Sequence, residues 1–95
     1  MRKAYLLVYS ASLGNRDQVK WALDKMPEII HWRTDLPNTF YVISEASASE
    51  LSKRLVQAVG KRGRFLFLEI TSNKQGWLHP DSWYLMNNKK HRPKT

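Results

Sequence analysis

The order of its periodic segments constrains most strongly what this chain can fold into. Four short apolar runs, rich in β-branched and aromatic residues and bounded by turn-forming ones, predict strands. They cover residues 3–9, 29–33, 39–44 and 64–71. Two amphipathic helical patterns lie between them, at residues 15–26 and 47–60. With 95 residues, the chain has room for one small domain that contains all six elements.

The resulting order, β-α-β-β-α-β, predicts an α+β fold of the ferredoxin-like type. In such a sandwich two helices cover one face of a four-stranded antiparallel sheet. Asn15 and Ser47 are suitable N-caps, and Ser47 has the capping-box spacing to Glu50. We expect the core-facing residues of the helices to be Val19, Ala22, Leu23, Met26, Leu51, Leu55, Ala58 and Val59.

Period-two alternation divides the predicted sheet into an aliphatic face and an aromatic face. We expect the aliphatic set to lie under the helices: Leu6, Val8, Phe40, Val42, Leu66, Leu68 and Ile70. The outward set is then Tyr5, Leu7, Tyr9, Tyr41, Ile43, Phe65, Phe67 and Glu69. So apolar a face should not stay in water. It should form a dimer interface, stack nucleobases, or be covered by the segment that holds Trp77 and Trp83.

The charge of the chain favours an anionic partner. Sixteen Lys and Arg residues against eight Asp and Glu leave a formal net charge of +8, which suits nucleic acid phosphates. We expect phosphate contacts from Arg16, Lys61, Arg62, Arg64, Lys89, Lys90 and Arg92. Residues 1–86 should form the domain, and residues 87–95 a basic tail that is disordered until it meets a partner.

Several classes of site and location lack support in the sequence. The chain has no cysteine, which removes disulfides and thiolate metal sites and suits a cytoplasmic protein. No stretch approaches the ~20 apolar residues of a membrane span, so we expect no membrane partner. The three histidines have no metal-ligand spacing, and no nucleophile elbow or phosphate-binding glycine loop is present. We therefore expect no metal site and no cofactor.

Three pieces of the chain carry a family resemblance. They are Tyr5–Ser10, then Thr39–Ile43 with Ser47–Leu51, and finally Leu68–Thr71 with Gly76–Leu78 and Trp83. Through them the chain resembles the small CRISPR-associated protein 2-like proteins, and most closely their SinR-like relatives. The resemblance implies a ferredoxin-like homodimer that meets sheet face to sheet face and contacts nucleic acid. It also implies, for some members, metal-dependent nuclease activity.

The sequence departs from this family at the position that matters for catalysis. The resemblance places an Asp at the end of the first strand, where two protomers together would hold one Mg²⁺. Here that position is Ser10, and a neutral hydroxyl is a poor ligand for a hard divalent cation. We therefore expect no catalytic residue and no nuclease activity; Mg²⁺ would be needed only if the chain were a nuclease after all.

The main hypothesis is a catalytically silent, nucleic-acid-binding homodimer. Its expected interface residues are Tyr5, Leu7, Tyr9, Tyr41, Phe65, Phe67, Trp77 and Trp83. One alternative is an accessory module, of phage or mobile-element type, that grips a host protein through the same aromatic face. A second is a metal-dependent endonuclease acting on RNA or DNA. An RNA-recognition motif has the same element order, but the run at 39–44 lacks its signature of a basic residue, Gly and aromatics.

Overall fold

A computed structural model describes residues 1–60 and 63–93 of the chain. The strands are β1 (Lys3–Tyr9), β2 (Ile29–Arg33), β3 (Thr39–Ser44) and β4 (Phe65–Glu69). The helices are the 3₁₀-helix η1 (Ala11–Leu13) and the α-helices α1 (Arg16–Asp24), α2 (Ala48–Val59) and α3 (Pro80–Asn88). The predicted α+β class with a four-stranded antiparallel sheet is confirmed. None of the helices in these residues is long and apolar enough to cross a membrane.

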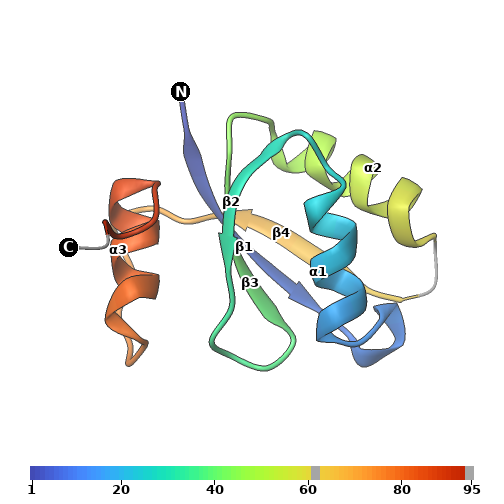
Figure 1. The fold of residues 1–95 in the computed structure, drawn as a ribbon, viewed down its shortest axis with the longest axis horizontal. Helices are drawn as coiled ribbons and strands as arrows, with labels where there is room; N and C mark the ends of the chain where they lie inside the picture. The colour runs from blue at the N-terminus through green and yellow to red at the C-terminus, as the bar shows by residue number, and fades with distance from the viewer. Residues whose placement is uncertain (61–62, 94–95) are drawn as a thin grey trace.

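The sheet has the strand order β2-β3-β1-β4, and every neighbouring pair is antiparallel. The central strand β1 places Leu7 opposite Phe40 of β3 and opposite Phe67 of β4. The two outer strands, β2 and β4, form the edges of the sheet. Helices α1 and α2 lie side by side on one side of the sheet, and α3 lies on the other (Figure 1).

The predicted starts of α1 and α2 are confirmed. The Asn15 side chain accepts from the Gln18 N–H at 2.9 Å, and the Gln18 side chain accepts from the Asn15 N–H at 2.8 Å. Ser47 and Glu50 make the equivalent reciprocal pair. These capping boxes satisfy backbone donors that the first turn of a helix leaves free. Of the expected core residues, only Ala58 is exposed; the others are buried.

The assignment of faces was wrong for β1 and β4. Residues directly opposite in an antiparallel pair share a face, and Tyr5 lies opposite Val42. The aromatic residues of β1 and β4 therefore belong to the core beneath α1 and α2, whereas Tyr41 of β3 lies on the opposite face. That core contains Tyr5, Leu7, Tyr9, Phe40, Val42 and Phe67 from the strands, packed on Val19, Leu23, Leu51 and Leu55. Only for β3 did the predicted sides hold, since both faces of the other strands are apolar and alternation alone does not orient them.

The opposite face of the sheet, here called the back face, is covered in part by α3. Leu85 and Met86 pack on Ala4, Tyr41 and Ile43, and Trp83 packs at the border of this cluster. The segment around Trp83 therefore covers part of a sheet face, but not the face beneath which Tyr5 and Phe67 lie, and Trp77 is exposed. Helix α3 itself continues through Asn88.

The uncovered part of the back face is a strip of aliphatic side chains at the β4 edge. Val8, Leu66 and Leu68 are 40%, 57% and 41% exposed. We predicted that these residues lie under the helices, and that prediction is wrong. Val8 pairs with Leu66, and Leu68 with Leu6, so these side chains lie together on the face away from α1 and α2. The strip is unusual because apolar side chains of this size are mostly buried.

Candidate nucleic-acid interface

The end of β1 and the start of β4 meet at Ser10. The Ser10 N–H donates to the Arg64 carbonyl at 2.8 Å, and the Ser10 Oγ accepts from the Arg64 N–H at 2.9 Å. The same Oγ lies 2.9 Å from the Ser12 Oγ. The side chain at the family's acid position therefore fastens two strands together. We call the region formed by residues 10–16 and 63–64 the Ser10 corner.

Gly63 allows the two segments of the Ser10 corner to touch. A Cβ built on Gly63 would lie 2.8 Å from both Leu13 Cα and Ser12 Oγ, closer than a real Cβ can approach. Leu13 is itself buried in the core, so η1 cannot simply move away. The absence of a side chain at Gly63 thus allows the backbone that precedes β4 to pack against η1, and this contact fixes the backbone position of Arg64.

Two predicted phosphate-binding residues belong to this corner. Arg16 is the first residue of α1, and Arg64 immediately precedes β4. Burial raises the pKa of Tyr9, and the positive charge of Arg16 counteracts that rise. Within residues 1–60 and 63–93, neither arginine forms an ion pair. The predicted Lys61 and Arg62 lie outside the described residues.

The first tail cation, Lys89, lies at the other end of β1. The Arg2 guanidinium donates to the Lys89 carbonyl at 2.9 Å, so the end of α3 sits beside the start of β1. A seven-residue strand is about 20 Å long, and Lys89 is therefore separated from the Ser10 corner. Arg92 pairs with Asp81 at 3.2 Å, which reduces its availability for phosphate, whereas Lys90 is exposed.

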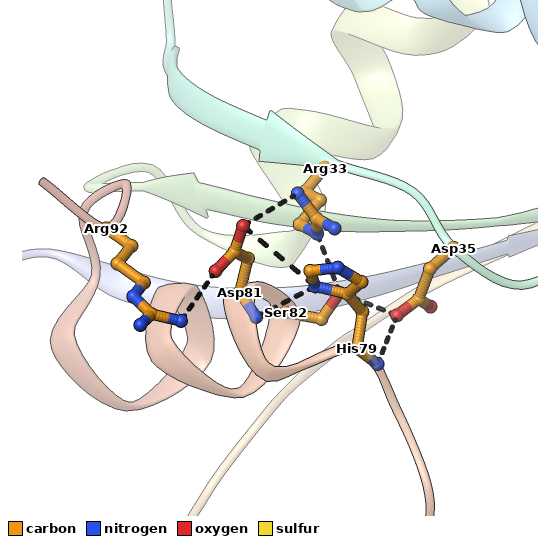
Figure 2. Close-up of polar contacts among 6 residues, drawn as sticks. All are labelled: Arg33, Asp35, His79, Asp81, Ser82 and Arg92. Atoms are coloured by element: carbon orange, nitrogen blue, oxygen red, sulfur yellow. Dashed lines mark hydrogen bonds and ion pairs between the residues drawn. The ribbon is translucent and has the colours of Figure 1, made fainter. Parts of the chain in front are cut away.

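A polar cluster attaches α3 to the hairpin of β2 and β3, as Figure 2 shows. The Asp35 carboxylate accepts from the Tyr41 hydroxyl at 2.6 Å, the Ser82 hydroxyl at 2.6 Å and the His79 N–H at 3.1 Å. Arg33 donates from Nε to the Ser82 Oγ at 2.8 Å. We call this group the Asp35 cluster; in it, Tyr41 and Ser82 are 1% and 0% exposed.

The Asp35 cluster stabilises the ionised carboxylate. Partial burial raises the pKa of Asp35, but the hydrogen bonds from Ser82, Tyr41 and His79 and the charge of Arg33 together hold it below its usual value. Burial and the carboxylate raise the pKa of Tyr41. With both hydroxyls buried and engaged, the cluster is suited to fixing α3 in place rather than to attacking a substrate. We did not predict this cluster; Pro80 and Asp81, a common helix start, were its one signal in the sequence.

The histidines of the described residues take part in two different contacts, one between His31 and His91 and one at His79. The rings of His31 and His91 lie edge to face at 4.7 Å, and the His79 Nδ1 accepts from the Asp81 N–H at 3.1 Å. Burial lowers the pKa of His31, and His91 and Arg2 lower it further. Within residues 1–60 and 63–93, no group of three or more His, Cys, Asp or Glu side chains is placed to hold a metal ion.

The residues predicted for the dimer interface do not form one surface in the structure. Tyr5, Leu7, Tyr9 and Phe67 are buried beneath α1 and α2, Phe65 is half-buried on the same side, and Tyr41 is buried beneath α3. Trp83 is half-buried, whereas Trp77 is 98% exposed beside a groove of about 490 Å³. The aromatic face proposed for a protein partner is thus inaccessible.

Comparison of the chain with protein-family models, curated proteins and solved structures finds no match.

Proposed function

We propose that this chain binds nucleic acid phosphates as a homodimer, in the manner of the CRISPR-associated protein 2-like proteins that it resembles. The observation that carries the proposal is the Ser10 corner. It contains Arg16 and Arg64, neither of which has an ion-pair partner among the described residues. In the sequence, Lys61 and Arg62 precede Gly63 and Arg64. Several cations in one region of the chain suit a ligand with several negative charges.

The position of Arg16 adds a second electrostatic argument. The N-terminal end of a helix carries partial positive charge, so a basic residue in the first turn is unfavourable there. Arg16 occupies the first position of α1. A bound phosphate would offset this repulsion, as anions commonly do at helix N-termini. The overall charge of +8 would attract the polyanion over a longer range.

The topology supports the family proposal. We propose that the fold is ferredoxin-like, because the order β-α-β-β-α-β and the strand order β2-β3-β1-β4 fit the split β-α-β arrangement. The helix α3 is then an addition that covers part of the back face. It also holds Lys89 beside Arg2 at the start of β1, away from the Ser10 corner, so we propose two distinct phosphate contacts on each protomer.

Binding should depend on Arg16 and Arg64. We expect the double change Arg16→Gln, Arg64→Gln to weaken binding of a fluorescent 20-nucleotide single strand about tenfold in low salt. The slope of log affinity against log salt should become shallower by about 1.5, because two phosphate contacts are lost. Fluorescence anisotropy between about 50 and 200 mM salt measures both quantities.

A matched control separates a local contact from a loss of net charge. The double change Lys25→Gln, Lys53→Gln removes the same charge from exposed positions just after α1 and on α2 and should leave most of the affinity intact. The tail is tested by Lys89→Asn with Lys90→Gln, since Asn tolerates the left-handed backbone at position 89 (φ 58°). If the Arg16/Arg64 pair and the Lys25/Lys53 pair weaken binding equally, the Ser10 corner is not the interface.

We also propose that the chain does not cleave its nucleic acid. The Ser10 hydroxyl is neutral and already bonded to Arg64 and Ser12, so it is a poor candidate for a Mg²⁺ ligand. Labelled RNA and DNA incubated with the protein and Mg²⁺ or Mn²⁺ should remain intact on a denaturing gel. Metal-dependent cleavage that Ser10→Ala abolishes would show that this part of the proposal is wrong.

A further inference from the structure

We infer that β4 is a dimerisation edge, which pairs antiparallel with β4 of a second copy of this chain. The inference rests on the proposed function in one respect, the expectation of a homodimer. It adds which surface of the chain forms that dimer. The two sheets would then join edge to edge. This differs from the face-to-face contact expected from the sequence, whose aromatic residues are buried under the helices.

The backbone of β4 has hydrogen-bonding groups that face away from the sheet. Arg64 and Ile70 bond to β1 through the pairs with Ser10 and Ala4. Because backbone groups alternate in direction along a strand, Leu66 and Leu68 also bond toward β1. The N–H and C=O groups of Phe65, Phe67 and Glu69 therefore point outward, to the side where the sheet order ends.

The two edges of this sheet differ in protection. The β2 edge has a register irregularity between Ile29 and His31, and its Arg33 belongs to the Asp35 cluster. Bulges and charges of this kind prevent a strand from pairing with another molecule. The sequence of β4 is Phe-Leu-Phe-Leu-Glu, without Pro or Lys, and its pairing with β1 is regular. Such an edge is expected to pair.

The apolar strip of the back face makes β4 complementary to itself. In an antiparallel pair centred on Phe67, each Leu66 lies opposite the partner's Leu68 on the back face. These two side chains are 57% and 41% exposed in the single chain, and cross-strand apolar pairs stabilise a sheet. The same register uses every outward backbone group from Phe65 to Glu69. A second copy thus satisfies both the hydrogen bonds and the apolar surface.

The charges at the ends of β4 favour the antiparallel arrangement. Arg64 stands before the strand and Glu69 at its end, and both are exposed. Antiparallel pairing places each Glu69 opposite the partner's Phe65, one residue from the partner's Arg64. The opposite charges then stand at the same end of the joint, although their side chains leave opposite faces of the sheet. A parallel pair would place like charges together, which is unfavourable.

Sedimentation equilibrium of the full chain tests the edge. We expect a reversible dimer in the micromolar range and expect Leu66→Lys to weaken it by about a hundredfold, because a charge would enter an apolar contact. Leu66 is largely solvent-exposed in the protomer, so the variant should fold. Leu36→Lys is the matched control: Leu36 is 43% exposed but lies between β2 and β3, and this variant should remain a dimer.

A charge reversal provides a second test that does not depend on apolar contacts. Glu69→Arg should weaken the dimer, and the double change Arg64→Glu, Glu69→Arg should restore it. A monomeric wild-type chain, or a dimer indifferent to Leu66→Lys and to the charge reversal, would overturn the edge proposal. Nucleic acid binding by such a monomer would leave the proposed phosphate contacts standing, so the two failures are distinguishable.

Discussion

Asp35→Ala should lower the free energy of unfolding by about 3 kcal/mol, because it leaves the Tyr41 and Ser82 hydroxyls without an acceptor. Those hydroxyls belong to residues only 1% and 0% exposed, so water does not readily replace the carboxylate. The carboxylate itself is exposed; the loss arises from its buried partners. Chemical denaturation followed by tryptophan fluorescence measures the change.

The size of the loss can be judged against a single hydrogen bond. Among the residues that the structure describes, Asp24 accepts one side-chain hydrogen bond, from the Trp32 Nε1–H at 2.7 Å, and Asp24→Ala should cost about 1 kcal/mol. A domain of this size has about 5–10 kcal/mol of stability in total, so the Asp35 change is severe. Equal losses in the two variants would mean that the Asp35 cluster does not fix α3 to the sheet.

The same cluster predicts a dependence on pH. The pKa of Asp35 is lowered in the folded chain, so its contribution is complete above the unfolded value of about 4. It is lost as pH falls through the lower, folded pKa. The stability difference between the wild type and Asp35→Asn should therefore be constant near neutral pH and shrink in acid. A difference that grows as pH falls would contradict the assigned direction.

Gly63→Ala should destabilise the chain by about 2 kcal/mol, because the new methyl group would collide with the backbone at Leu13. The collision is with a buried segment, so either η1 or the start of β4 has to move. Since Arg64 is the next residue, nucleic acid affinity should fall as well. Thermal unfolding and anisotropy measure the two effects on the same sample.

Gly76 is a matched control for Gly63. A Cβ at Gly76 would meet nothing within 4 Å, and this glycine is not among those with positive φ. Gly76→Ala should therefore be neutral or slightly stabilising, since it reduces the freedom of the unfolded chain. If Gly63→Ala is equally harmless, then the two segments of the Ser10 corner are not in the close contact described here.

Local signals made much of the fold predictable. The ranges of the first three strands are confirmed, as are the N-caps Asn15 and Ser47. In each case the information lies within a few residues: a capping side chain, a turn, or an uninterrupted apolar run. The last strand is shorter than predicted and ends at Glu69, because Ile70 turns away from the ladder after one further bond to Ala4.

The orientation of β1 and β4 could not be predicted from alternation. Both faces of β1 are apolar, so Tyr5 and Leu6 are equally compatible with burial, and only the pairing partner decides between them. The Asp35 cluster was unpredictable for a related reason. It joins Asp35 to Ser82, which lie 47 positions apart, through the docking of a helix. The cationic residues were predictable as a set, but their separation into two groups depends on where α3 ends.

The binding surface can be mapped directly by titrating ¹⁵N-labelled protein with a short single-stranded oligonucleotide at low salt. If the Ser10 corner binds phosphate, the largest amide shift changes fall in residues 10–16 and 63–64, with a second, smaller set near Lys89 and Lys90. Unchanged amide shifts at the Ser10 corner, with binding confined to the tail or absent altogether, would show that this corner is not the interface.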